Sequence, residues 1–179
     1  MPNQSTTTPV DPAAADLMKL FRLDGAAVVV TGAGRGIGRD FAIAMAAQGA
    51  SVVVNDPGVS ESGTGSDAGP AQQVVDEIRA AGGKAVANMD SVAEWASANR
   101  IIQCATDSFG RLDVVVNNAG ILRDRVVWKL TDDDWQAVLG VHLTGTFNMT
   151  RAAVPAMREQ GYGRIVNVTS YTGLHGNVG

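Results

Sequence analysis

The sequence predicts an α/β fold, a doubly wound parallel sheet of the Rossmann type that is incomplete at its C-terminal side. Three observations support this prediction: strand-like runs alternate with helical segments, the runs are apolar without interruption, and a glycine-rich turn follows the first run. Continuous runs such as Val28–Val30 and Val114–Val116 are typical of strands that helices cover on both faces.

Five strands and four helices are expected, in alternation. The predicted strands are 27–31, 51–55, 85–88, 112–117 and 164–169. The predicted helices are 36–48, 70–81, 92–109 and a long one, 131–157. Thr131, followed by Asp134 three residues later, is a capping-box pattern that marks the start of the long helix. The Gly/Ser-rich stretch 56–69 indicates a long loop between strand and helix.

One domain accounts for the length and composition. The 179 residues are 45% hydrophobic and 18% charged, as in an ordinary globular domain. Residues 1–16 are rich in Thr, Pro and Ala without apolar periodicity, so we expect a flexible leader. Residues 17–179 are expected to form a dinucleotide-binding Rossmann domain, the N-terminal part of a longer single-domain enzyme.

Charge and cysteine content indicate which classes of partner and which cellular compartment to expect. The net charge of −4 disfavours nucleic acid as a partner. No apolar run approaches the roughly 20 residues that span a bilayer, so no membrane partner is expected. Cys104 is the only cysteine and no secretory pattern precedes it, which favours the reducing cytosol. No metal site is expected.

The glycine-rich turn follows the first strand directly and leads into a helix. Residues 31–38 read TGAGRGIG, a T-G-x-x-x-G-x-G spacing. Such glycines let the backbone approach a pyrophosphate, which the helix N-terminus attracts with its free N–H groups. The alternative is a turn that merely packs strand against helix. The predicted cofactor-binding residues here are Gly32, Arg35, Gly36, Ile37 and Gly38.

Asp56 follows the second strand, about 20 residues past the turn, where a carboxylate can accept the ribose hydroxyls of an adenosine. A 2′-phosphate would be repelled there, so Asp56 favours NAD over NADP. Arg35 acts in the opposite sense, since a guanidinium could meet a 2′-phosphate. The alternative for Asp56 is a solvated turn residue before Pro57.

The glycine turn, the segment 117–120 (NNAG) and the segment 164–170 (RIVNVTS) together resemble the short-chain dehydrogenase/reductase family. The match extends from about residue 23 to 179. Finer features are similar to the (3R)-hydroxyacyl-CoA dehydrogenase unit of multifunctional β-oxidation enzymes. These features are Asn55-Asp56 with the loop after it, 82–88 (GGKAVAN), 117–125 (NNAGILRDR) and 141–143 (VHL).

The resemblance implies roles for further residues. Asp90, with Ser91 or Val92 beside it, would hold the adenine of the cofactor. The segment from Asn117 through Ala119 to Gly120 would lie along the cofactor and tie the fourth strand to its neighbour. Ser170 matches the catalytic serine, whose hydroxyl holds the substrate oxygen in this family; its alternative is an ordinary turn serine.

His142 stands where most of the family has an asparagine whose backbone carbonyl contributes to a proton relay. A relay role and simple packing both stay open for this candidate catalytic residue. The family's Tyr-x-x-x-Lys pair is expected a few residues past Gly179, because neither Tyr162 nor Tyr171 has a lysine four residues later. We therefore expect the chain to continue with a tyrosine-bearing helix and two further strands.

The resemblance implies an NAD-dependent oxidoreductase that interconverts a secondary alcohol and a ketone. A (3R)-hydroxyacyl thioester is the first substrate class to consider, and a steroid or other hydroxy compound the second. If the chain ended at residue 179, a non-catalytic dinucleotide sensor or interaction module would be the alternative. A homodimer or homotetramer is implied, formed through the long helix that carries Trp135 and Phe147.

Overall fold

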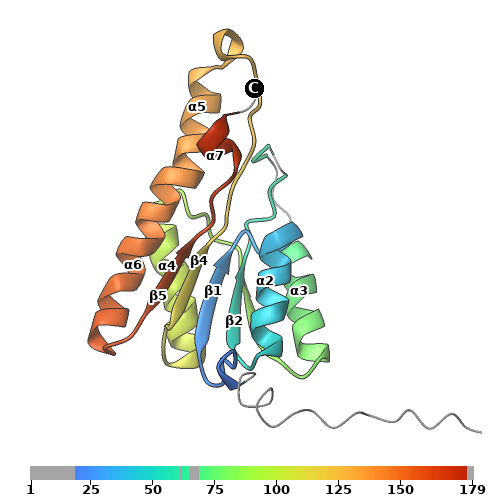
Figure 1. Ribbon diagram of the computed structural model, residues 1–179, viewed down its shortest axis with the longest axis vertical. Coiled ribbons are helices and arrows are strands. Elements are labelled where there is room, and N and C mark those ends of the chain that lie inside the picture. The colour runs from blue at the N-terminus through green and yellow to red at the C-terminus, as the bar shows by residue number, and fades with distance from the viewer. Residues whose placement is uncertain (1–18, 61, 65–68, 177–179) are drawn as a thin grey trace, which may run out of the picture.

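The computed structural model describes residues 19–60, 62–64 and 69–176, and in them a five-stranded parallel sheet has helices on both faces (Figure 1). The strands are β1 (Ala27–Thr31), β2 (Ser51–Asn55), β3 (Lys84–Asn88), β4 (Val114–Asn117) and β5 (Arg164–Asn167). Their order in the sheet is β3-β2-β1-β4-β5. The predicted parallel α/β sheet is confirmed, while the leader expected at 1–16 lies outside the described residues.

Helices connect successive strands, and one short helix follows the last strand. They are α2 (Gly36–Ala47), α3 (Gly69–Ala80), α4 (Trp95–Phe109), α5 (Asp132–Leu139), α6 (Gly145–Glu159) and α7 (Thr172–His175). A 3₁₀ turn, η1 (Val127–Lys129), precedes α5, and a π-helical segment, η2 (Gly140–Thr144), joins α5 to α6. Among the described residues, no helix combines the length and apolar character that crossing a bilayer requires.

The apolar runs of the central strands are buried because each strand packs on two layers of helices. Val28 and Val30 of β1 face a core formed with α2 and α3. Val29 points the other way, into a core that includes Ile101 of α4 and Met149 of α6. This double coverage explains why the valine runs show no alternation of apolar and polar residues.

Two helix predictions need correction. The helix expected from residue 92 begins at Trp95, because residues 91–94 form a turn in which Ala93 N donates to Ser91 Oγ (3.2 Å). The long helix expected over 131–157 is interrupted by the π turn η2 between two α-helices. Gly140 is the first residue of this turn and Gly145 follows it, and glycine weakens regular helix. The capping box at Thr131 and Asp134 is confirmed.

Two strands are shorter than expected at one end. The fourth begins at Val114 rather than Leu112. Just before it, Asp113 is held at the base of the sheet, where its carboxylate accepts from Ala27 N (2.8 Å) and from the Arg111 guanidinium (2.7 Å). Burial opposes its charge, but these hydrogen bonds outweigh burial and hold the pKa of the Asp113 carboxyl below its usual value.

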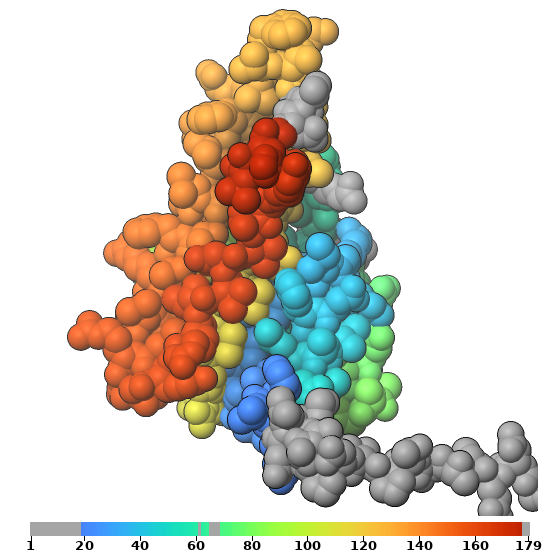
Figure 2. Space-filling view, in the orientation of Figure 1, coloured from blue at the N-terminus to red at the C-terminus, as the bar shows by residue number. Residues whose placement is uncertain are grey.

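The strand expected over 164–169 ends at Asn167, where its pairing with β4 ends. Like β3, it is an edge strand of the sheet, and most of its residues are exposed. In the space-filling view, β5 and the segment after it form a continuous outer band beside α6 (Figure 2).

Candidate cofactor site

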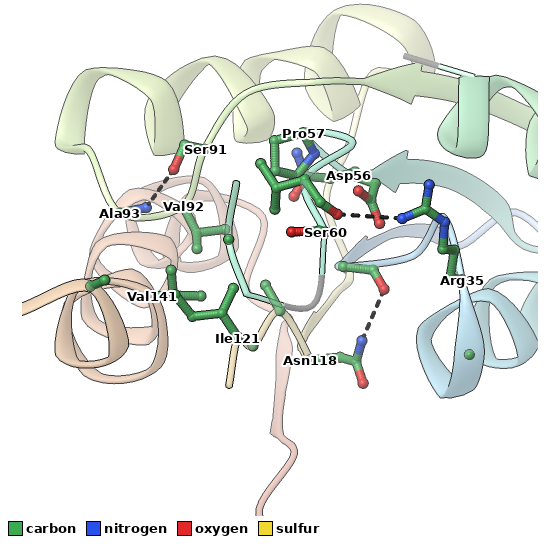
Figure 3. A pocket seen from close by; sticks show the side chains of 18 residues that line it. Arg35, Asp56, Pro57, Ser60, Ser91, Val92, Ala93, Asn118, Ile121 and Val141 are labelled. Carbon is green, nitrogen blue, oxygen red and sulfur yellow. Dashed lines mark hydrogen bonds between the residues drawn. The ribbon is translucent and has the colours of Figure 1, made fainter. Parts of the chain in front are cut away.

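A cavity of about 500 Å³ lies at the carboxyl ends of β1, β2 and β4. This is where the chain's strand order reverses direction, the usual ligand position in open parallel sheets. Its walls come from the turn after β1, the end of β2, the turn after β3, the segment after β4 and η2 (Figure 3). The predicted site residues that line it are Gly32, Arg35, Gly36, Asp56, Ser91, Ala119 and Gly120.

The glycines of the turn divide into two groups. A Cβ on Gly32 would lie 2.8 Å from Ala119 Cα, and a Cβ on Gly38 would overlap the Gly32 carbonyl oxygen. These two glycines let the turn pack closely against its own chain. Gly36 has φ +53 and a Cβ there would meet nothing within 4 Å. Gly36 therefore lies at the start of α2 on the wall of the cavity, and the space beside its Cα is open to a ligand.

Thr31 and Asn118 fasten the turn to the neighbouring strand. Thr31 Oγ1 accepts from the backbone N–H groups of Asn118 (3.1 Å) and Ala119 (3.0 Å). The Asn118 amide donates to the carbonyls of Thr31 (3.0 Å) and Gly32 (3.1 Å). Thr31 was not among the predicted site residues, whereas Asn118 belongs to the segment 117–120 that was expected to lie along the cofactor and to tie the strands together.

Asn117, which was predicted, points toward the other side of β4. Its amide nitrogen donates to Asn167 Oδ1 on β5 (2.8 Å), and it does not line the cavity. The strand-tying role expected for the NNAG segment is thus divided. Asn118 ties β4 to β1, while Asn117 ties β4 to β5.

Asp56 is fixed by the backbone on both oxygens. Oδ2 accepts from Gly34 N (2.9 Å) and Oδ1 accepts from Gly58 N (2.8 Å). Each carboxylate oxygen keeps an acceptor position, so two hydroxyls of a ligand can still be bound. Arg35 also lines the cavity, with its guanidinium donating to the Val59 carbonyl (3.4 Å; Figure 3).

The turn after β3 presents Ser91, Val92 and Ala93 to the cavity, but Asp90 is not on its wall. The Asp90 carboxylate accepts instead from Arg100 of α4 and from the Asn88 amide (3.0 Å). Sequence reasoning placed Asp90 correctly after β3 but gave no indication of these partners.

His142 packs against the backbone that follows β4. Its Nε2 lies 2.9 Å from the Ile121 carbonyl oxygen and 3.1 Å from Ile121 N, so it can donate to the first or accept from the second. A Cβ on Gly120 would lie 2.6 Å from His142 Cε1. The structure thus shows the packing contact, and the relay role stays a prediction.

Ser170 lies beyond β5, on an exposed turn. Its hydroxyl is 2.9 Å from Thr172 Oγ1 and accepts from Thr172 N (3.2 Å), and it does not line the cavity. Nearby, the rings of Tyr171 and His175 stack with centroids 4.2 Å apart. Besides Ser170, five other predicted residues are off the cavity wall: Ile37, Gly38, Asp90, Asn117 and His142.

Known proteins resemble this chain closely. The family model described as short chain dehydrogenase matches residues 26–179. A putative short-chain type dehydrogenase/reductase of Mycobacterium tuberculosis is 54% identical over 152 residues, which is 85% of this chain and 53% of that protein. The peroxisomal multifunctional enzyme type 2 of Drosophila melanogaster is 51% identical over 159 residues, 89% of this chain and 26% of that protein.

A solved structure has the same arrangement of elements. A 7α-hydroxysteroid dehydrogenase in complex with NADH and 7-oxo glycochenodeoxycholic acid superposes with a TM-score of 0.81 at 31% identity, over 89% of this chain and 59% of that one. The chain therefore spans about half the length of two of these proteins and about a quarter of the third.

Proposed function

The chain belongs to the short-chain dehydrogenase family, and from that premise we propose that its cavity binds NAD in an enzyme that interconverts a secondary alcohol and a ketone. The observation that carries the proposal is the pairing of Gly36, open at the start of α2, with the Asp56 carboxylate on the same cavity. The first suits a pyrophosphate and the second suits a ribose.

The residues present fit a dinucleotide. The first turn of α2 has backbone N–H groups without intrahelical partners, and the helix dipole favours an anion beside Gly36. Asp56 is held by two backbone amides, so it is oriented before any ligand arrives. The carboxylate also disfavours the 2′-phosphate of NADP, which supports NAD as the cofactor of choice.

When bound, the nicotinamide supplies hydride transfer to or from the substrate carbon. For this chain's own part, Ser170 would hold the substrate oxygen by its hydroxyl. Moving the hydroxyl proton at neutral pH requires a base, and a phenol with pKa near 10 serves only beside a cation. The family uses a tyrosine and a lysine for this step, and in the given sequence neither Tyr162 nor Tyr171 has a lysine four residues later.

A (3R)-hydroxyacyl thioester is the proposed substrate class. Its support is the 51% identity to a peroxisomal multifunctional enzyme type 2, together with the segments around Asn55, Asn117 and His142 that resemble the hydroxyacyl-CoA dehydrogenase unit. A steroid or other hydroxy compound is the second candidate, because the structural relative solved with a bile acid derivative is 31% identical.

The proposal also includes self-association and a reducing compartment such as the cytosol. Trp135 (53% exposed), Leu143 and Phe147 are large apolar side chains on α5, η2 and α6 that stay exposed. A second copy of this helix pair would cover them.

The only cysteine, Cys104, is half-buried, and burial raises the pKa of its thiol, which suits an unreactive cysteine. Light scattering and cell fractionation test these two points.

Titration with NADH and with NADPH tests the cofactor assignment. We expect the unmodified protein to bind NADH at least about tenfold more tightly, and Asp56→Ala to lose most of that preference. Asp76→Ala on α3 is the matched control, because its exposed carboxylate bonds only to the Gln72 side chain among the described residues. Equal affinity for both dinucleotides in the unmodified protein would refute the assignment to NAD.

A dinucleotide sensor is the second candidate function. The observation that favours it is that Ser170 is off the cavity wall, so the cavity alone accounts for binding but not for chemistry. An assay with a (3R)-hydroxyacyl thioester and NAD separates the two. Binding of NADH without turnover of any secondary alcohol favours the sensor.

A further inference from the structure

An open groove of about 570 Å³ lies at the end of the sheet opposite to the cofactor cavity. The cavity is at the carboxyl ends of the strands, whereas this groove is at the amino ends of β2 and β3, the lower end of the sheet in Figure 1. Its walls come from the turn before β1, the first residue of β2, the end of α3 with the start of β3, and the end of α4. Its volume is in the range of small-molecule sites.

Two cations line the groove, and no carboxylate of the described residues does. Arg79 is in the last turn of α3, and Lys84 is the first residue of β3. Asp24 and Asp107 are next in sequence to lining residues but are not on the wall, and Asp24 is paired with Arg22. On a chain of net charge −4, the groove is therefore a local concentration of positive charge.

Arg79 is oriented without being neutralised. Its Nε donates to the Ala85 carbonyl oxygen (3.0 Å), which fixes the plane of the guanidinium. Within the part of the chain that the structure describes, neither Arg79 nor Lys84 forms an ion pair. The two Nη groups of Arg79 are thus left for a ligand, and a guanidinium binds a phosphate through two parallel N–H bonds.

Hydroxyl groups and apolar surface complete the groove. Ser51 and Lys84 are register partners at the amino ends of β2 and β3, and Ser108 adds a second hydroxyl from the end of α4. Val86 and Phe109 supply apolar surface. Hydroxyls can donate to phosphate oxygens, while apolar surface suits a carbon skeleton. The groove therefore matches an organic phosphate better than a bare inorganic ion.

We propose that this groove is a second ligand site, which takes a small organic phosphomonoester with its phosphate on Arg79 and Lys84. Such a group carries a charge of about −1.5 to −2 near pH 7, which two cations balance. The inference does not depend on the proposed dinucleotide function, because no residue of the groove lines the cofactor cavity. Both cations are exposed, so binding should be weak and salt-dependent, with a Kd of about 1 mM.

Titration with phenyl phosphate tests the site, and phenol, which is uncharged near pH 7, is the matched compound without the phosphate. Amide resonances of the full chain, followed by ¹H–¹⁵N NMR, separate the two sites: Gly25 and Gly83 report on the groove and Gly36 on the cofactor cavity. We expect phenyl phosphate to shift the groove resonances and to bind at least about tenfold more tightly than phenol. That binding should be nearly lost in about 1 M salt.

Arg79→Ala and Lys84→Ala each remove one of the two charges. We expect Arg79→Ala to weaken phenyl phosphate binding by about tenfold and Lys84→Ala by about fivefold, while Arg79→Lys keeps part of the affinity. Arg39→Ala is the matched control for the arginine, because Arg39 is paired with Glu77 and is off the groove. Lys129→Ala on η1 is the control for the lysine. Both controls should leave the affinity unchanged.

Equal affinity for phenyl phosphate and phenol would overturn the inference, and so would an unchanged affinity in Arg79→Ala and Lys84→Ala. Shifts confined to Gly36 would also overturn it, but they would leave the proposed function standing. Failure to bind NADH would refute the proposed function and leave the groove untouched. Lys84→Ala keeps the test decisive if Arg79→Ala, which loses its bond to Ala85, does not fold.

Discussion

β1 and β5 belong to the same sheet and pair in the same parallel manner, yet their surroundings differ. Val29 of β1 is 0% exposed, with α2 and α3 behind one face of the sheet and α4 and α6 behind the other. Val166 of β5 is 46% exposed, and within the described residues β4 is the only strand beside it. Backbone pairing alone therefore does not bury a strand.

The contrast extends to the residues that follow each strand. After β1, the glycine turn is fastened by Thr31, Asn118 and the Asp56 carboxylate. After β5, the Ser170 hydroxyl bonds only to Thr172 within the described residues. Substitutions near β1 should therefore disturb folding and dinucleotide binding together, whereas equivalent ones near β5 should have small effects on both.

Replacing a helical glycine in each region gives the largest expected difference. Gly38→Ala places a methyl group against the Gly32 carbonyl and the Asn118 amide, which are both held in place. We expect it to lower the free energy of unfolding by about 3 kcal/mol and to abolish NADH binding. Gly173→Ala in α7 meets its nearest atom, Thr169 Oγ1, at 3.8 Å and should be neutral or stabilise by about 0.5 kcal/mol.

Urea unfolding and NADH titration of both glycine variants provide the measurement. The comparison fails if Gly38→Ala unfolds at the same urea concentration as the unmodified protein. It also fails if Gly173→Ala is the more damaging of the two.

Replacing one valine by alanine in each strand measures directly how well that strand is covered by helices. Val29→Ala should cost about 2.5 kcal/mol, because it leaves a cavity between the sheet and its helices. Val166→Ala should cost less than about 0.5 kcal/mol, because Val166 is 46% exposed and loses little packing. Chemical denaturation of both variants measures the two losses in free energy of unfolding. A large cost for Val166→Ala would show that further protein covers β5.

The strand and helix pattern was predictable because the central strands are buried on both faces, which leaves unbroken valine runs in the sequence. Thr131 and Asp134 likewise signalled a cap that the structure contains. The π turn at 140–144 was not predictable from periodicity, because a hydrophobic pattern does not distinguish α-helical from π-helical hydrogen bonding over a single turn. The start of α4 was missed because the Ser91 hydroxyl forms a turn with Ala93 instead of a helical bond.

The candidate site was predictable where a residue's role depends on its place along the chain, as for Gly36 and Asp56. It was not predictable where the role depends on which neighbour a side chain meets across the sheet. The sequence does not distinguish Asn118, which faces β1, from Asn117, which faces β5. The partners of Asp90 were hidden for the same reason, since Arg100 lies ten residues away on a helix.

Acid stability should also differ between covered and exposed positions. The Asp113 carboxyl has a lowered pKa in the folded protein, so the stability it contributes is present above its unfolded value of 3.8 and is lost as pH falls through the folded pKa. Asp113→Asn should cost about 2 kcal/mol at pH 7, and the difference from the unmodified protein should shrink below pH 4.

Asp24→Asn is the matched control, since Asp24 also pairs with an arginine two residues before it but is exposed. It should unfold at the urea concentration of the unmodified protein at pH 7. Urea unfolding at pH 7, 4 and 3 measures both variants. A difference for Asp113→Asn that stays constant down to pH 3 would contradict the role of its charge.

The smallest expected effect concerns η2, which carries His142 beside the well-packed segment after β4. Gly120→Ala should push the imidazole off Ile121, because its Cβ would lie 2.6 Å from His142 Cε1. In the His142→Ala background that space is free, so the same substitution should cost about 1 kcal/mol less. Gly32→Ala is the control, because its Cβ would meet the backbone at Ala119 Cα, which His142→Ala does not relieve. A double-mutant cycle followed by urea unfolding gives the coupling energy. If the costs of Gly120→Ala and His142→Ala simply add, the two positions are not coupled. Contact with His142 would then not be the reason for a glycine at position 120, and open space for the cofactor would explain that glycine better.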